Sequence, residues 1–142
     1  AESVCNDLSF GSMLLKPSDF DSEFLLGLQP ALWIAAPVLK VLPYTQLPSM
    51  ALLNKLPHST KAVFIYGGYW MANYVYPEQS HPHLLYGRSS NQELVNVPKN
   101  CDIAVDDFVF LRPSQSEAII PQFAQLNLYK NAQFESWQTF RD

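Results

Sequence analysis

The chain has 142 residues, which suits one domain with a hydrophobic core of its own. Hydrophobic residues make up 48% of it, aromatic residues 13% and charged residues only 15%, which excludes disorder and is consistent with a surface that a partner covers. The formal net charge of −4 and the lack of a basic run exclude a surface built to bind nucleic acid or an anionic membrane.

The N-terminal residues form no recognisable targeting segment, so we expect either a removed leader or a fragment of a longer protein. The most apolar stretch, residues 31–39, is too short to span a bilayer. Cys5 and Cys101 lie far apart without C-x-x-C spacing, which favours two free thiols in a reducing cytosol over a disulfide. The sequence therefore predicts a cytoplasmic protein.

The first third of the chain predicts a strand, a short helix and a second strand. Residues 8–15 are strand-like, and the helix is expected to begin at Ser18, a good N-cap, and to end near Gly27. Residues 31–42 have the length and apolar content of a buried strand. Pro37 predicts that this strand lies at an edge, carries a bulge or is split.

The middle of the chain predicts one clear strand and an aromatic segment. Residues 43–57 allow at most one or two helical turns, whereas residues 61–66 have the pattern of a strand. The Gly67-Gly68 pair then predicts a bulge or a close approach of two backbone segments. Four aromatic rings follow within residues 69–76, and we favour core packing for them over the wall of a pocket.

Residues 77–93 are loop-like and contain an H-x-H pair, His81 and His83. On a strand this pair could offer two imidazoles to one metal ion. No cysteine or obvious third ligand lies nearby in the sequence, which favours surface or pocket histidines over metal ligands.

The last third of the chain holds the polar segment most suggestive of a site. Residues 94–97 and 108–111 predict strands, and the second should end at Pro113, which cannot donate to a sheet. Gln115 and Glu117 would point the same way on an extended chain and could build a site there. A polar turn between two strands is the favoured alternative.

These elements predict a mostly β fold, an antiparallel barrel or sandwich with one or two short helices, in a single domain over residues 1–142. Residues 123–129 and 134–140 form its last expected hairpin, around a turn at residues 130–133. The chain contains no internal repeat and no G-x-S-x-G, P-loop, H-E-x-x-H, EF-hand or dinucleotide-binding motif. The residues alone thus predict a β domain without a particular chemistry.

Four blocks follow one another along the chain: residues 6–12 (NDLSFGS), 29–40 (QPALWIAAPVLK), 67–70 (GGYW) and 105–117 (VDDFVFLRPSQSE). In order and approximate spacing they resemble the C-terminal domain of the fold-type III pyridoxal-phosphate enzymes, the group of D-serine dehydratase-like enzymes, D-threonine aldolases and amino-acid racemases. This resemblance covers most of the chain.

The resemblance implies a longer parent enzyme in which two domains have separate roles. An N-terminal α/β barrel, absent from this chain, would hold pyridoxal phosphate on a Schiff-base lysine, a position that neither Lys40 nor Lys61 matches. The C-terminal β domain would close the active site, with homodimers common in the group. The cofactor would serve as electron sink for a carbanion at the α-carbon of an amino acid, in D-amino-acid metabolism.

The chain departs from the family pattern where dehydratase and aldolase members carry metal ligands, written Pro-x-His-x-Cys or Pro-x-His-x-Asp. Here Pro113, Gln115 and Glu117 stand in those places, so the soft zinc ligands are missing. An amide and a carboxylate suit a harder ion or none, and we expect no metal. An upstream Glu-His pair of the family is also replaced, with Glu93 at that place. Tyr69, after the double glycine, is the residue expected to serve as acid or base, or to contact the cofactor phosphate.

The working hypothesis is therefore the C-terminal domain of a pyridoxal-phosphate-dependent racemase or aldolase, inactive without its barrel. The expected residues around its site are Tyr69, Gln115, Glu117, His81, His83 and Glu93. The alternative is a stand-alone β-rich binding or structural module that needs neither cofactor nor barrel. A core tyrosine remains the alternative for Tyr69.

Overall fold

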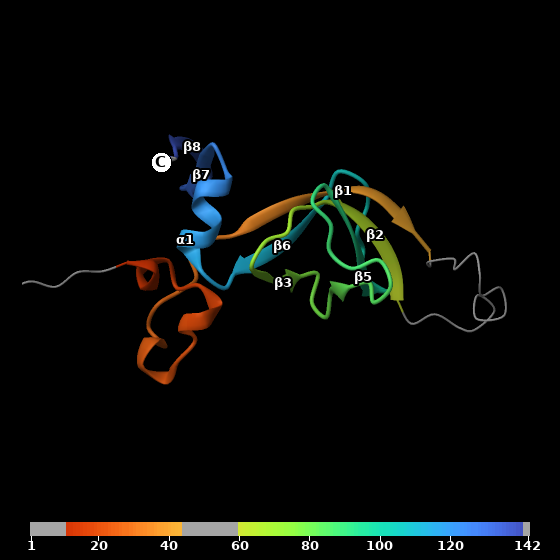
Figure 1. Ribbon diagram of the computed structural model, residues 1–142, viewed down its shortest axis with the longest axis horizontal. Helices are drawn as coiled ribbons and strands as arrows, with labels where there is room; N and C mark the ends of the chain where they lie inside the picture. The colour runs from red at the N-terminus through yellow and green to blue at the C-terminus, as the bar shows by residue number, and fades with distance from the viewer. Residues whose placement is uncertain (1–10, 44–59, 141–142) are drawn as a thin grey trace, which may run out of the picture.

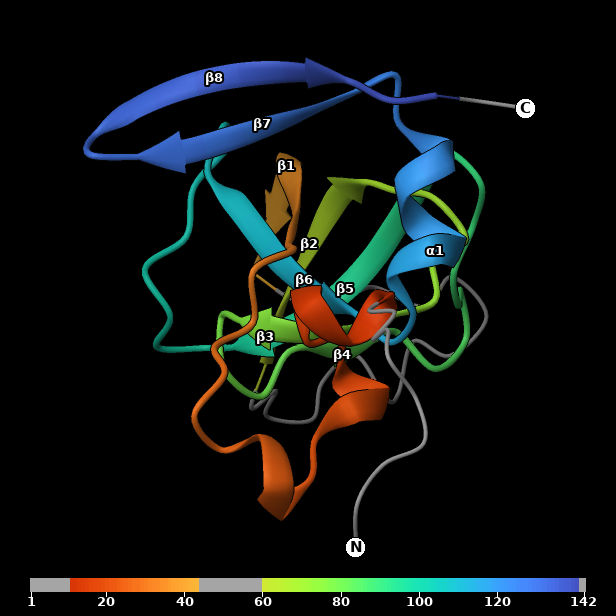
Figure 2. The ribbon, with the colours of Figure 1, turned by 90° about the vertical axis from the view of Figure 1, so that its left-hand side faces the viewer.

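The computed structural model describes residues 11–43 and 60–140 (Figure 1). Within them, six strands form one antiparallel sheet in the order β3-β6-β1-β2-β5-β4. Their bounds are β1 (Ile34–Leu42), β2 (Thr60–Tyr66), β3 (Ala72–Tyr76), β4 (His81–Pro82), β5 (Gln92–Pro98) and β6 (Phe108–Pro113). The sheet curls until it is nearly a closed barrel (Figure 2). The predicted mostly β, antiparallel fold is thus confirmed.

The remaining elements lie at one end of this sheet. A short helix, α1 (Ser116–Ile119), and a 3₁₀ helix (Ile120–Gln122) lead from β6 to a hairpin of β7 (Gln125–Lys130) and β8 (Gln133–Gln138). Three further 3₁₀ helices precede β1, namely Ser12–Leu15, Ser18–Phe20 and Glu23–Leu25. None of the helices in the described ranges is long and apolar enough to cross a membrane.

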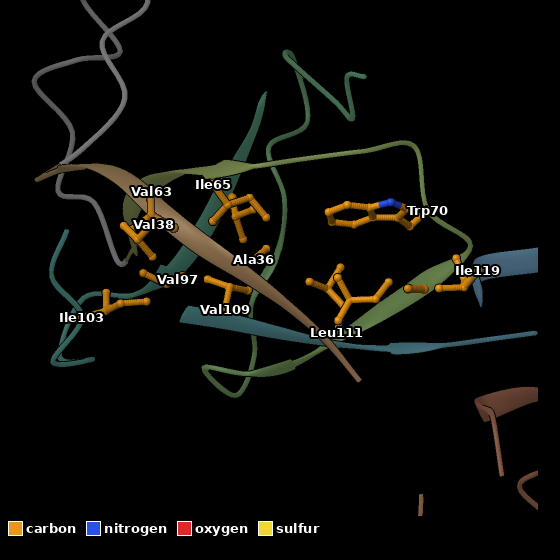
Figure 3. Close-up of a cluster of buried hydrophobic side chains, with 13 residues drawn as sticks. Ala36, Val38, Val63, Ile65, Trp70, Val97, Ile103, Val109, Leu111 and Ile119 are labelled. Carbon is orange, nitrogen blue, oxygen red and sulfur yellow. The ribbon is translucent and has the colours of Figure 1, made fainter. Parts of the chain in front are cut away.

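The core fills the inside of the curled sheet because apolar side chains alternate along its strands. In β6, Val109 and Leu111 point inward, whereas Phe108 and Phe110 stay partly exposed on the outer face. Each fully buried Val, Leu or Ile contributes about 1.5–3 kcal/mol to folding. Figure 3 shows these side chains meeting residues of β1, β2 and β5, with Trp70 and Ile119 at one end of the cluster.

Of the three alternatives that Pro37 predicted for this strand, an edge position, a bulge or a split, the structure shows a bulge in a central strand. β1 lies between β6 and β2, and its register shifts between Val38 and Lys40. Up to Pro37 the strand pairs with β6, and from Val38 onward it pairs with β2. The missing N–H of Pro37 therefore falls where the strand changes partner, which is how a central strand tolerates it.

The strand expected over residues 8–15 is wrong for its described part, since Ser12–Leu15 is a 3₁₀ helix. The helix expected from Ser18 to Gly27 is likewise two separate 3₁₀ helices, and no side chain caps the first. The segment 43–57 lies outside the described residues except for residue 43, and Cys5 lies outside them as well.

Tertiary hydrogen bonds explain why residues 12–28 depart from their local preferences. Arg112 of β6 donates to both carboxylate oxygens of Asp21, at 2.8 and 2.7 Å, and to the carbonyl of Lys16. The Lys16 ammonium in turn donates to the carbonyls of Leu25 and Leu28, at 2.9 and 2.7 Å. These bonds hold the segment in a compact, irregular conformation that a regular strand or helix could not adopt.

The predicted C-terminal hairpin is confirmed, with strands shorter than expected. Its turn consists of Asn131 and Ala132, whose φ values are 51° and 62°. Positive φ at both central residues is the signature of the type I′ turn, whose twist matches that of two paired strands. The turn fixes the hairpin register, in which Lys130 pairs with Gln133.

Candidate functional site

Two segments that carry predicted site residues meet at one end of the sheet. Ala72 pairs with Pro113, and the backbone N–H and hydroxyl of Ser114 both donate to the carbonyl of Met71, at 2.8 and 3.0 Å. This pairing brings the β2–β3 connection, with Tyr69, beside the β6–α1 junction, with Gln115. The side chain of Tyr69 is exposed, with 76% of its surface accessible, so it is not the core tyrosine of the alternative interpretation.

Gln115 and Glu117 do not point the same way from an extended chain, because α1 begins between them at Ser116. The favoured polar turn between two strands is also wrong for the same reason. Gln115 keeps extended backbone angles and its amide lies 3.5 Å from a carboxylate oxygen of Asp19. Glu117 stands in the first turn of α1.

A distant serine organises this helix start. The hydroxyl of Ser12 accepts from the backbone N–H of Ser116 at 3.2 Å and donates to the carboxylate of Glu117. The bond from Ser12 holds the pKa of Glu117 below its usual value, so Glu117 is charged at neutral pH. The junction thus presents an amide and a carboxylate, each with a partner from the N-terminal segment.

The two histidines lie at a different place, on and after the edge strand β4. His81 Nδ1 is 3.1 Å from the carbonyl of Gln79, and the ring of His83 packs on Tyr86 with centroids 5.2 Å apart. Burial, and secondarily the neighbouring His81, lower the pKa of His83, so it is neutral at pH 7. Residues 11–43 and 60–140 contain no group of three or more His, Cys, Asp and Glu placed to hold a metal ion.

Glu93 is the most buried of the predicted residues, with 1% of its surface exposed. The hydroxyl of Tyr74 donates to Glu93 Oε1, and Arg88 Nε lies 3.5 Å from the same oxygen. Arg88 also donates to the carbonyls of Trp70 and Ala72, at 2.6 and 2.7 Å. We call Tyr74, Arg88 and Glu93 the clasp, since they join strands from opposite ends of the sheet.

The position of the clasp follows from the strand order. Tyr74 is on β3 and Glu93 on β5, and β6, β1 and β2 separate these strands in the sheet. Only a strongly curled sheet brings such side chains into contact, and the contact in turn fastens the curl. The guanidinium carbon of Arg88 lies 5.6 Å from the centroid of the Tyr74 ring, which adds a cation–π contact.

The Gly67-Gly68 pair serves the close approach that the sequence predicted. A Cβ on Gly67 would lie 3.1 Å from the Cβ and the backbone nitrogen of Glu93. A Cβ on Gly68 would lie 2.6 Å from ring atoms of Trp70. The two glycines therefore let the β2–β3 connection pass directly over the clasp.

The electrostatics of the clasp suit a closed hydrogen-bonded unit. Burial raises the pKa of Glu93, while the Tyr74 hydroxyl and the Arg88 charge oppose that rise. Burial, and then the bond to Glu93, raise the pKa of Tyr74 far above its ordinary value, so its phenol remains a donor at any working pH. The sequence did not predict Tyr74 and Arg88 as site residues. Their only signals were that Tyr74 belongs to the aromatic run and that Arg88 is an isolated arginine.

Pyridoxal phosphate needs a free lysine amine and donors for its phosphate. Lys16 donates to two carbonyls and Lys61 donates to the carbonyl of Cys101, so neither of these amines is available. The residues seen around Tyr69, Gln115 and Glu117 do not form a site for this cofactor by themselves.

Comparison with known proteins adds no relative. No family model matches the chain, and neither a curated protein nor a solved structure shows a significant match to it.

Proposed function

We propose that this chain is the C-terminal β domain of a pyridoxal-phosphate-dependent amino-acid racemase or aldolase. It would close the active site of an N-terminal α/β barrel in the same polypeptide, in a homodimer of the cytoplasm. The observation that carries the proposal is the meeting of the Tyr69 and Gln115 segments at one end of the sheet, with Tyr69 exposed. The free thiol of Cys101 supports the location.

In this proposal the exposed end of the sheet faces the substrate. Tyr69 supplies a phenol to hold a proton or to contact a phosphate, and Gln115 supplies an amide for a polar group of the amino acid. Glu117 supplies a charged carboxylate, kept ionised by Ser12. The cofactor, held by the barrel, would supply the electron sink for the α-carbon.

Three of the sequence candidates are left out of this proposed site. Glu93 is enclosed in the clasp, where its oxygen already accepts from Tyr74. His81 and His83 lie on and just after β4, where their rings contact Gln79, Asn96 and Tyr86 rather than the Tyr69 and Gln115 segments. The site we propose is thus smaller than the sequence suggested.

A stand-alone β-rich binding or structural module is the second candidate. The clasp favours it, because its three side chains satisfy one another and fasten the curled sheet without help from another domain. Such a module would need no cofactor.

The test is the absorbance of the product of the complete gene. The proposal predicts the visible band of lysine-bound pyridoxal phosphate, and a change in this band with some members of a panel of D- and L-amino acids. Replacing Tyr69 with Phe and Gln115 and Glu117 with Ala should lower turnover at least about a hundredfold, in the range typical of lost acid–base groups. The matched control is Tyr66→Phe, another exposed tyrosine.

Two results would overturn the proposal. A well-folded gene product with no cofactor band would leave the binding module as the function. A cofactor band with wild-type turnover in the triple variant would keep the enzyme and remove these residues from its site.

A further inference from the structure

The β7–β8 hairpin stands apart from the six-stranded sheet (Figure 2). All six residues of β8 are exposed, and 75% of the surface of Phe134 and 54% of that of Trp137 is accessible. A two-stranded hairpin is only marginally stable in water, and three or more strands are normally needed. The exposed aromatic rings and the unpaired strands indicate a surface that becomes covered.

The hairpin register shows which backbone groups of β8 are free. In a hairpin with a two-residue turn, the residues that flank the turn form a hydrogen-bonded pair, and such pairs alternate along the ladder. Lys130 and Gln133 flank this turn, and the bond from Thr139 N to Ala124 O, at 3.0 Å, continues the same alternation at the far end.

The odd-numbered residues of β8 therefore bond to β7, and the even-numbered ones face away from it. The outward N–H and C=O groups belong to Phe134, Ser136 and Gln138, which no other strand of the described chain pairs with. A row of three such residues is a template for an added strand.

We propose that β8 of a second copy of this chain is that added strand, paired antiparallel about a two-fold axis at Ser136. With Ser136 opposite Ser136 of the second copy, all three outward-facing residues take part in the new ladder. Phe134 then stands opposite Gln138 of the second copy, and Gln138 opposite Phe134. The result is a continuous sheet of β7-β8-β8-β7, above the strand number at which a sheet is stable.

Charge and pairing length select this register over its neighbours. Residues that lie opposite each other in an antiparallel pair have side chains on the same face of the sheet. A two-fold symmetric pairing must therefore place one residue opposite the same residue of the second copy, and the register can change only by moving the axis to another residue. An axis at Glu135 would set two like charges opposite each other, which destabilises a strand pair. An axis at Trp137 would leave Phe134 opposite residue 140, beyond the end of β8. The axis at Ser136 places Glu135 beside Trp137 of the second copy.

This interface is independent of the proposed enzyme activity, because it needs only the hairpin of this chain. Its test therefore uses the 142-residue chain without cofactor or substrate. Sedimentation and light scattering over a range of concentrations should show a reversible dimer.

Ser136→Pro and Ser136→Ala form a matched pair of variants. Both lose the bond of 2.8 Å from the Ser136 hydroxyl to Asn127, but only proline also loses the outward N–H. Proline is tolerated on an edge strand whose N–H faces away from its neighbour, so the hairpin itself should persist. Ser136→Pro should raise the dimer dissociation constant about 30-fold over Ser136→Ala, for two lost hydrogen bonds. Near-ultraviolet circular dichroism of both variants reports whether the fold is intact.

Cysteine cross-linking tests the register itself, in a background with Cys5 and Cys101 replaced by serine. Ser136→Cys should form a disulfide between copies under a mild oxidant, because a hydrogen-bonded antiparallel pair sets Cα atoms about 5.5 Å apart. Gln133→Cys should not, since residue 133 lies about 20 Å from its own copy in this register.

The outcomes separate the possible occupants of this edge. A chain that remains monomeric, or a dimer that Ser136→Pro leaves as tight as Ser136→Ala, overturns the proposal. A monomer whose Ser136 amide is nevertheless protected from hydrogen exchange assigns the edge to another segment of the same chain. Equal cross-linking of the two cysteine variants rejects the register at Ser136.

Discussion

Removing one hydroxyl from the clasp tests whether it fastens the curl of the sheet. Tyr74→Phe keeps the ring under Arg88 and deletes only the donor to Glu93. Above the raised pKa of Glu93 that donor bonds a charged, buried acceptor, and a hydrogen bond of this kind contributes about 1.5–3 kcal/mol. Near pH 4, where Glu93 is protonated because its pKa is raised, the bond joins two neutral groups and contributes about 0.5–1.5 kcal/mol.

The assay is urea unfolding of wild type and variant at about pH 4 and about pH 7.5, with Tyr66→Phe as the control for an exposed ring. We expect the free energy of unfolding to fall by about 2 kcal/mol at the higher pH and about 1 kcal/mol at the lower. For a chain of this size, 2 kcal/mol corresponds to a fall in Tm of about 4–8 °C.

The control should stay within about 0.5 kcal/mol of wild type at both pH values. If Tyr74→Phe behaves like Tyr66→Phe, the hydroxyl is not bonded to Glu93 in solution and the clasp does not hold the sheet. A loss that is the same at both pH values would show that the acceptor carries no charge.

Two further predictions concern the same end of the sheet. The stability of wild type relative to Glu93→Gln should fall as pH rises above 4.5, the ordinary pKa of a glutamate. The reason is that the raised pKa makes the folded state keep a proton that the unfolded state releases. Thermal melts at several pH values measure this stability difference, and a difference that rises with pH would mean that Arg88 and Tyr74 outweigh burial. Gly68→Ala should destabilise the fold by about 1–3 kcal/mol, since its Cβ would meet the Trp70 ring. The control Gly27→Ala, with open space around its Cβ, should be near neutral. Equal Tm values for the two variants in thermal melts would show that the indole moves aside.

Strands with strong local signals could be predicted from the sequence. β2 and β6 are runs of strand formers, and the type I′ hairpin lies where a polar turn separates two such runs. Pro37 signalled an irregular strand, but the sequence could not show that this strand lies inside the sheet. That placement depends on β6, about seventy residues further along the chain.

The candidate site was harder to predict because its partners are remote in sequence. Glu117 enters a helix rather than an extended segment since Ser12, 105 residues earlier, caps that helix. Glu93 was noticed as a possible site residue, yet its burial depends on Tyr74 and Arg88 reaching it across a curled sheet. Short-range patterns contain none of these contacts.

The attachment of the N-terminal segment to Arg112 has a consequence for synthesis on the ribosome. Residues 12–21 emerge early, but the guanidinium and the helix start that bind them lie 91 to 105 residues later. The earliest described segment can therefore dock only after almost the whole domain has been made. Contacts of such long range slow folding, and until they form the segment remains open to chaperones and proteases.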